Sequence, residues 1–119
     1  MEYLLVGTGG IFGSLLRYYI GKAIAEKANT VLPLGTFIIN ITGALLLGFI
    51  TSMNISSNGY YFFADGFLGA YTTFSTFMYE GFNLFQDREK LNAFIYIIGS
   101  LFIGIVGFAI GLWIGKILK

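Results

Sequence analysis

The chain has 119 residues, with 7 Lys and Arg against 6 Asp and Glu, so its formal net charge is +1; 56% of the residues are hydrophobic and 18% are aromatic. A soluble domain of this size cannot bury that much apolar surface, so the composition excludes a soluble globular protein and predicts a membrane protein. The sequence has no His and no Cys, which excludes disulfides, thiol nucleophiles, imidazole proton relays and the usual transition-metal ligands, and its charge gives no basic footprint for nucleic acid.

Four apolar stretches follow one another along the chain. Each has about the 20 residues that a helix needs to cross the hydrocarbon core of a bilayer. The connections between them are too short to fold separately. We therefore expect an all-α membrane protein that forms a single membrane domain over residues 1–119. Its four transmembrane helices are predicted at about 3–24, 32–53, 61–84 and 91–115.

The first predicted span contains the sequence GGIFGSLLRY at residues 9–18. Gly9 and Gly13 are four residues apart and so lie on one helix face, where small residues let two backbones approach in lipid. Arg17 comes late in this span. Its side chain either extends to the membrane interface, as long cationic side chains do, or forms a vestibule that attracts anions.

The second predicted span places three small or polar residues on one face. Thr36 and Asn40 are four residues apart, and Gly43 follows near the same face. An Asn at membrane depth can tie two helices together. Its amide also has two N–H donors, which can replace water around an anion. Both interpretations of Asn40 remain open at this point.

The third predicted span is interrupted by the polar sequence GAYTTFSTF at residues 69–77. Four Ser and Thr side chains stand at bilayer depth, where backbone freed from helical hydrogen bonds must be buried in protein, bound to an ion or exposed to water. We therefore predict that the third helix is broken near its middle and that the break serves a charged species. This pattern favours ion transport.

Two phenylalanines and two carboxylates belong to the same span. Phe74 and Phe77 are three residues apart and should project from one face, where they either pack or turn their electropositive ring edges toward an anion. Glu80 follows three residues later, and because a bare carboxylate would repel an anion we expect it to be paired, hydrogen-bonded or protonated. Asp65 is expected at the membrane interface or near a helix N-terminus.

The fourth predicted span carries a glycine stripe and a pair of hydroxyl groups. The glycines recur every four residues, at Gly107, Gly111 and Gly115, and predict a helix contact within one subunit or between two. Tyr96 and Ser100 share a face and add two hydroxyls. A four-helix chain has little interior to enclose a path by itself, so we expect a homo-oligomer, most simply a homodimer.

The charges flanking the spans give a weak orientation signal. The bias is four against two, so the chain either inserts one way, with its first and third loops cytoplasmic, or inserts both ways and forms an antiparallel dimer. One side carries Lys22, Lys27, Arg88 and Lys90, and the other carries Lys116 and Lys119.

Three motifs, at residues 9–18, 35–43 and 69–77, resemble those of the small fluoride channels, also called Fluc or CrcB proteins. They occur in the right order in spans of the right number and length, and the resemblance covers essentially the whole chain. It implies a dual-topology, antiparallel homodimer in the cell membrane with two pores that conduct fluoride passively and lower its cytoplasmic concentration. Ring edges and amides would serve chloride equally well, so the choice of fluoride comes from the resemblance.

The resemblance also implies roles for individual residues. Each pore would take its phenylalanines from both subunits, Asn40 would supply a donor, and Arg17 and Glu80 would belong to the vestibule. The implied pore residues are Phe74, Phe77, Asn40, Thr36, Tyr96 and Ser100. The backbone carbonyls of Gly69 and Thr72 from both subunits would hold a structural sodium ion on the dimer axis, where oxygen ligands suit a hard cation.

Two other functions were weighed against a channel. A small proton-coupled multidrug exporter needs a membrane-embedded carboxylate, typically in the first span, where this chain has only Glu2 at the edge and Arg17. A non-conducting assembly subunit held together by the glycine stripes would leave the polar sequence at residues 69–77 without a use. The sequence therefore favours a channel, and no enzymatic activity is expected.

Overall fold

The computed structural model describes residues 2–27 and 33–118, and every regular element within them is helical, which confirms the predicted all-α class. Most of the predicted first connection, and Lys119 of the charge count, lie outside the described residues. The elements are α1 Glu2–Lys27, α2 Leu34–Met53, α3 Ser57–Tyr60, the π-helix η1 Tyr61–Leu68, α4 Gly69–Tyr71, α5 Ser75–Gln86 and α6 Lys90–Leu118.

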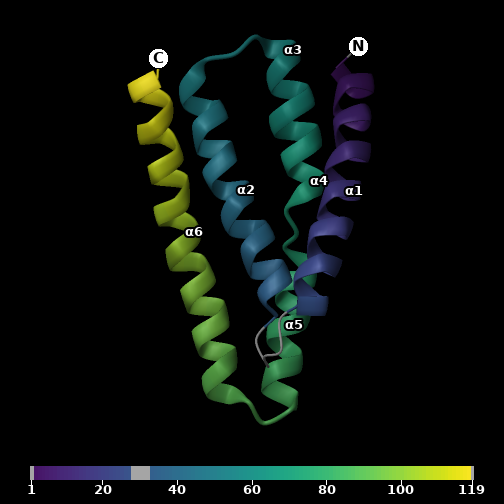
Figure 1. The fold of residues 1–119 in the computed structure, drawn as a ribbon, viewed down its shortest axis with the longest axis vertical. Coiled ribbons are helices and arrows are strands. Elements are labelled where there is room, and N and C mark those ends of the chain that lie inside the picture. Colours follow the sequence, from purple (N-terminus) through teal and green to yellow (C-terminus); the bar gives the residue numbers. More distant parts are fainter. Residues whose placement is uncertain (1, 28–32, 119) are drawn as a thin grey trace.

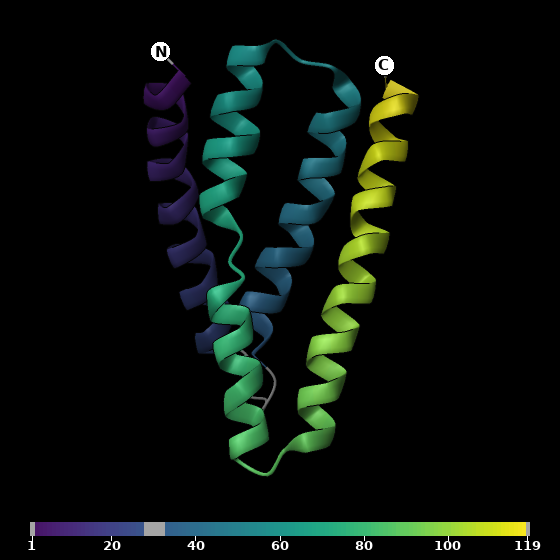
Figure 2. The ribbon, with the colours of Figure 1, turned by 180° about the vertical axis from the view of Figure 1, so that it is seen from behind.

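The helices form an elongated bundle measuring 47 × 30 × 22 Å (Figures 1 and 2). Its long dimension is close to the thickness of a bilayer with its headgroups, about 40–45 Å. Both ends of the chain lie at one end of the bundle, and the turn between α5 and α6 lies at the other. The most extensive packing is between α2 and α6, followed by that between α1 and η1.

Three helix boundaries lie beyond those expected. α1 continues to Lys27 and α6 to Leu118, three residues past the predicted ends of their spans. α3 begins at Ser57, inside the stretch predicted as a connection. The hydroxyl of Ser56 accepts the N–H of Gly59 at 3.2 Å and so caps the new helix start. Asp65 consequently lies within η1, several residues after that start, with its side chain exposed. Of the two positions expected for Asp65, the helix N-terminus is therefore wrong, and the membrane interface stays a prediction.

The glycine stripe of α6 packs against α2 within the same protomer. A Cβ atom on Gly111 would collide with the carbonyl oxygen of Leu45, and one on Gly115 with the Ser52 side chain. From the opposite helix, a Cβ on Gly48 would collide with the Phe108 carbonyl oxygen. The two helices therefore touch backbone to backbone, as small residues permit in a membrane.

The glycines of α1 make a second contact of the same kind. A Cβ atom on Gly9 would collide with the carbonyl oxygen of Phe62, and one on Gly13 with that of Phe67. Gly66 of η1 in turn lies against the backbone of Val6. Gly9 and Gly13, predicted to share a contact face, thus let α1 pack closely against η1.

Two helices of the described part, α2 and α6, are long and apolar enough to cross a membrane, judged by length and composition alone. α6 exposes many large apolar side chains, including Phe102 and Trp113, whereas α2 exposes two, Ile38 and Leu46. The first and third spans carry more polar residues, so their assignment as membrane spans stays a prediction.

The turn after α5 contains a strained residue and gives a stability test. Arg88 has φ 63°, a left-handed conformation that glycine adopts without the Cβ penalty. We expect Arg88→Gly to raise the free energy of unfolding by about 1 kcal/mol. The midpoint of denaturant unfolding in detergent measures this change. Gln86→Gly, at the helical end of α5, should instead lower the midpoint; a fall with Arg88→Gly would contradict the argument.

Candidate functional site

Residues 72–74 separate α4 from α5 and have no regular structure (Figure 2). Thr72 is extended, with φ −82° and ψ 160°. The side chain of Asn40 holds this segment through two hydrogen bonds to Thr73: the N–H of Thr73 donates to Oδ1 and Nδ2 donates to the Thr73 carbonyl, each at 2.9 Å. The Asn40 amide therefore ties α2 to the segment, and one of its two N–H groups remains for another acceptor.

α2 also holds the residues just before Thr73. The hydroxyls of Thr42 and Tyr71 lie 2.9 Å apart. The Thr42 hydroxyl donates to the Ile38 carbonyl at 2.8 Å, so the Tyr71 hydroxyl is the donor between the two. A Cβ on Gly43 would collide with the methyl group of Thr72, which shows how closely the segment lies against α2.

Two backbone carbonyls beside the segment lose their helical partners. In a continuous helix, the Gly69 carbonyl would accept the N–H of Thr73 and the Thr72 carbonyl that of Thr76. The N–H of Thr73 instead bonds Asn40, and that of Thr76 bonds the Thr73 hydroxyl at 3.3 Å. Within residues 2–27 and 33–118, no cluster of acidic side chains that could hold a metal ion is found. The carbonyl oxygens of Gly69 and Thr72 are of the kind that a hard cation binds.

An open pocket of about 380 Å³ lies on one side of the segment. It brings together residues from α2, α4, α5 and α6 that are far apart in the sequence. Six of the predicted site residues line it: Asn40, Gly69, Thr72, Phe74, Phe77 and Ser100.

The two phenylalanines are neighbours in very different environments. Their ring centroids are 6.2 Å apart. Phe77 is 5% exposed and packs on Tyr96 of α6, with ring centroids 5.1 Å apart, whereas Phe74 is 72% exposed. Phe77 thus belongs to the core of the protomer, and Phe74 projects from it.

The two predicted hydroxyls of α6 are buried. Tyr96 and Ser100 are both largely inaccessible, and neither hydroxyl has a hydrogen-bond partner in the described part of the chain. Leaving a buried hydroxyl unpaired is costly, so such groups commonly serve a bound species. Both are donors that a small anion can use.

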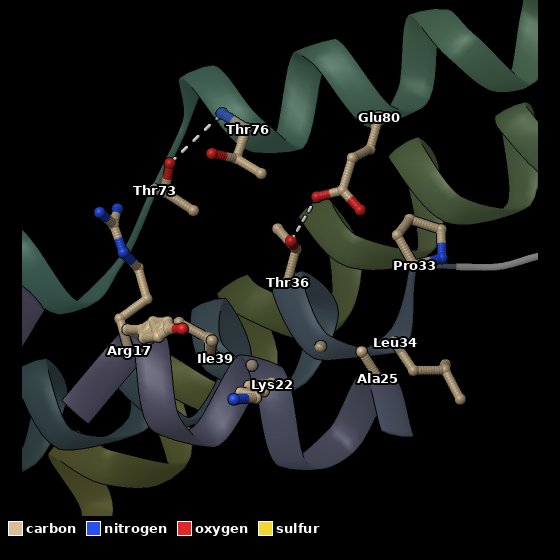
Figure 3. A pocket seen from close by; sticks show the side chains of 13 residues that line it. Arg17, Lys22, Ala25, Pro33, Leu34, Thr36, Ile39, Thr73, Thr76 and Glu80 are labelled. Carbon is tan, nitrogen blue, oxygen red and sulfur yellow. Dashed lines mark hydrogen bonds between the residues drawn. The ribbon is translucent and has the colours of Figure 1, made fainter. Parts of the chain in front are cut away.

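A second pocket, of about 690 Å³, lies between α1, α2 and α5 (Figure 3). Arg17 and Glu80 line it, and the Thr36 hydroxyl donates a hydrogen bond to Oε1 of Glu80. Glu80 is therefore hydrogen-bonded, one of the three states expected for it. Lys22 also lines this pocket, with its ammonium 6.0 Å from the ring centroid of Tyr18.

Sequence reasoning missed Lys22 and Thr73 as site residues. The four-residue spacing between Tyr18 and Lys22 on α1 could have indicated their contact. Thr73 lies inside the polar sequence that was singled out, but nothing in that sequence distinguishes it from its three neighbouring hydroxyls. In the structure, Thr73 lines both pockets.

Comparison with known proteins gives a consistent family. The model of a family described as "CrcB-like protein, Camphor Resistance (CrcB)" matches residues 4–112. A relative from Clostridium acetobutylicum named "Fluoride-specific ion channel FluC 2" is 57% identical over 117 residues, which are 98% of this chain and 100% of that protein. A relative from Bacillus cereus, with the same name, is 40% identical over 98% of this chain and 99% of its own. A Mycobacterium bovis protein of that name is 39% identical over 92% of this chain and 86% of its own.

Proposed function

Because this chain belongs to the CrcB-like protein family, we propose that it is a passive, fluoride-selective ion channel that exports fluoride and lowers its concentration in the cytoplasm. The observation that carries the proposal is 57% identity to the full length of a relative named as a fluoride-specific ion channel. The family identified from the three sequence motifs is confirmed by the family match. The activity is transport through a membrane and not catalysis.

The entrance of the proposed path is the pocket of about 690 Å³ that Arg17 and Glu80 line, which we call the vestibule pocket. A cationic side chain beside a polar opening raises the local concentration of anions. Glu80 lies in the same pocket, where its carboxylate accepts from Thr36. This arrangement supports the vestibule roles that the family resemblance implies for Arg17 and Glu80.

The proposed pore follows the pocket of about 380 Å³ that Phe74 and Phe77 line, which we call the phenylalanine pocket. An anion that sheds water there meets ring edges, an N–H of Asn40 and the hydroxyl of Ser100, which has no partner within the described residues. Tyr96 packs against Phe77 and is not among the residues that line this pocket, so its hydroxyl would act from beside it. Such groups stabilise an anion without the deep binding of a fixed cation, and conduction needs moderate binding. The Thr36 hydroxyl lies toward the vestibule, where it donates to Glu80.

We further propose that two copies assemble as an antiparallel, dual-topology homodimer in the plasma membrane, each chain crossing it several times. α3 to α5 would form one transmembrane helix broken at residues 72–74. The exposure of Phe74 supports this assembly, because an aromatic ring projecting from one protomer can complete a pore of the other. The flanking charges, four against two, give only a weak bias toward one orientation and so allow insertion in both directions.

A structural sodium ion on the dimer axis completes the proposal. Gly69 and Thr72 would hold it through their carbonyl oxygens, which lack their usual helical donors in the described chain. When bound, the ion supplies positive charge next to both pores. Gly69 and Thr72 fit such an ion because their carbonyl oxygens are suitable ligands and the N–H groups that would bond them in a continuous helix bond elsewhere.

Fluoride efflux from liposomes tests the proposed function. The purified protein is reconstituted in vesicles loaded with potassium fluoride, and an external fluoride electrode follows release after a potassium ionophore is added. We expect rapid fluoride release and, in matched vesicles, little chloride release. Equal rates of fluoride and chloride release would overturn the proposed selectivity. Release that needs an opposing proton gradient would overturn passive conduction.

Gly69→Ala tests the proposed axial site. Within the protomer, a Cβ at Gly69 meets nothing nearer than the Ala64 carbonyl oxygen at 3.8 Å, so the single chain accommodates it. At a two-fold axis the added methyl would hold the backbones apart, at an overpacking cost of about 1–3 kcal/mol.

We therefore expect Gly69→Ala to keep its helix content by circular dichroism while the dimer fraction in detergent and the fluoride flux both fall. Gly7→Ala is the control, because nothing lies within 4 Å of its Cβ position. A Gly69→Ala protein with normal dimer fraction and normal flux would exclude a close backbone approach at this position.

A further inference from the structure

Thr73 stands where the two pockets of the protomer meet. It lines the vestibule pocket with Arg17 and Glu80, and it also lines the phenylalanine pocket with Asn40 and Phe74. A species that passes from one pocket to the other along the 72–74 segment therefore passes this side chain. An anion at this position could be contacted by the backbone N–H or by the side-chain hydroxyl of Thr73.

The backbone of Thr73 is already fully bonded. Its N–H donates to Asn40 Oδ1 and its carbonyl accepts from Asn40 Nδ2, both at 2.9 Å. Two bonds from one side chain fix the position and orientation of the peptide groups on either side of Thr73. The hydroxyl is the remaining polar group, and it projects from a backbone position that this double contact fixes.

The hydroxyl of Thr73 has a proton to donate. Its Oγ1 accepts the N–H of Thr76 at 3.3 Å, and it donates to no acceptor among the described residues. The neighbouring Thr72 hydroxyl differs, because it donates to the Leu68 carbonyl at 2.9 Å. Thr42 likewise donates to its own helix. Among these three threonines, Thr73 alone keeps its O–H free for a ligand.

We propose that the Thr73 hydroxyl binds the permeating anion at the junction of the two pockets, donating its hydrogen bond to the ion as it leaves the vestibule and before it reaches Phe74. The inference rests on the proposed function. A hydroxyl donor favours a small, strongly accepting anion such as fluoride over a larger one. Asn40 has a second role in this arrangement, since its two bonds to the Thr73 backbone aim the hydroxyl.

Valine and serine variants at this position test the proposal. Thr73→Val keeps the shape and removes the hydroxyl, and Thr73→Ser keeps the hydroxyl. We expect Thr73→Val to lower fluoride efflux from liposomes by about tenfold or more, the loss of one hydrogen bond to a charged group, and to raise the half-saturating fluoride concentration. Thr73→Ser should retain most of the flux. Thr8→Val is the control, because that hydroxyl only bonds the Leu4 carbonyl of its own helix.

Thr73→Val also removes the acceptor for the Thr76 N–H, so the unfolding midpoint and the dimer fraction are measured on every variant. Reduced flux with both quantities unchanged, and recovery in Thr73→Ser, supports the proposal. Unchanged flux in Thr73→Val overturns it. Flux that returns to normal once it is divided by the amount of folded dimer also overturns it, because the hydroxyl then only caps α5. A wild-type protein that releases no fluoride refutes the proposed function itself.

Discussion

Replacing Phe74 by isoleucine should lower fluoride flux by about tenfold while the protomer keeps its fold. Isoleucine retains much of the apolar volume but has no ring quadrupole, and pairs of aromatic rings, which interact through the same quadrupole, gain about 0.5–1.5 kcal/mol from it. Each 1.36 kcal/mol at the barrier changes a rate about tenfold. Phe74 is 72% exposed in the protomer, so little packing within the chain is lost. Efflux from liposomes measures the rate.

Phe77→Ile should reduce flux to a similar degree and also lower stability, because Phe77 is buried against Tyr96. The unfolding midpoint separates these two effects. Phe102→Ile is a matched control: Phe102 is 68% exposed on α6 and does not line the phenylalanine pocket. Normal flux in both Phe74→Ile and Phe77→Ile would remove the rings from the conduction mechanism.

Gly111→Val should prevent the protomer from folding. The first added carbon would collide with the carbonyl oxygen of Leu45, a backbone atom that cannot rotate away. Overpacking of a tight contact costs about 1–3 kcal/mol for modest insertions. A collision with the backbone between α2 and α6, the most extensively packed helix pair, should cost more than this. The loss is then a large part of a typical free energy of unfolding, which is about 5–15 kcal/mol. We expect aggregated protein and no dimer peak in size-exclusion chromatography.

Gly99→Val provides the control on the same helix. Nothing lies within 4 Å of a Cβ at Gly99, so the protomer has room for the side chain. This variant should give a normal chromatographic profile. A folded Gly111→Val protein would show that α2 and α6 do not approach as closely as described, whereas failure of both variants would point to a second contact made by the Gly99 face.

The positions of the helices followed from the sequence more closely than their contacts did. Runs of about 20 apolar residues located α2 and α6 to within a few residues, because helix length is set by the bilayer. α3 was missed because its start depends on a local cap at Ser56, and the apolar run begins only after it. The π-helix η1 left no signal that composition or periodicity could detect.

Glycine spacing predicted tight helix contacts without identifying their partners. A stripe such as Gly107, Gly111 and Gly115 shows that a backbone comes near, but many helices could supply it. The partner became clear only when Gly48 of α2 was found against the Phe108 backbone. Pairing of helices distant in sequence depends on how all the faces fit at once, which a single helix does not encode.

The sequence predicted most residues of the candidate site but not the hydrogen bonds that they make. Helical spacing put Thr36 and Asn40 on one face, and both do bond the α4–α5 region, yet the specific acceptors could not be read from the spacing. Spacing also treated Phe74 and Phe77 alike. Their exposures differ because α6 covers only Phe77, through Tyr96, and coverage by another helix is a tertiary property.

The packing of α2 against α6 has a consequence for biosynthesis. α6 is translated after α2, so α2 enters the membrane without the neighbour that makes most of its contacts. α1 and η1, in contrast, are both translated before α6 and can associate earlier. Contacts between segments far apart in sequence form late, and chains generally become compact in the order of their synthesis. A ribosome stalled before α6 therefore leaves a half-assembled protomer, with the glycine face of α2 open to lipid and to quality-control proteases.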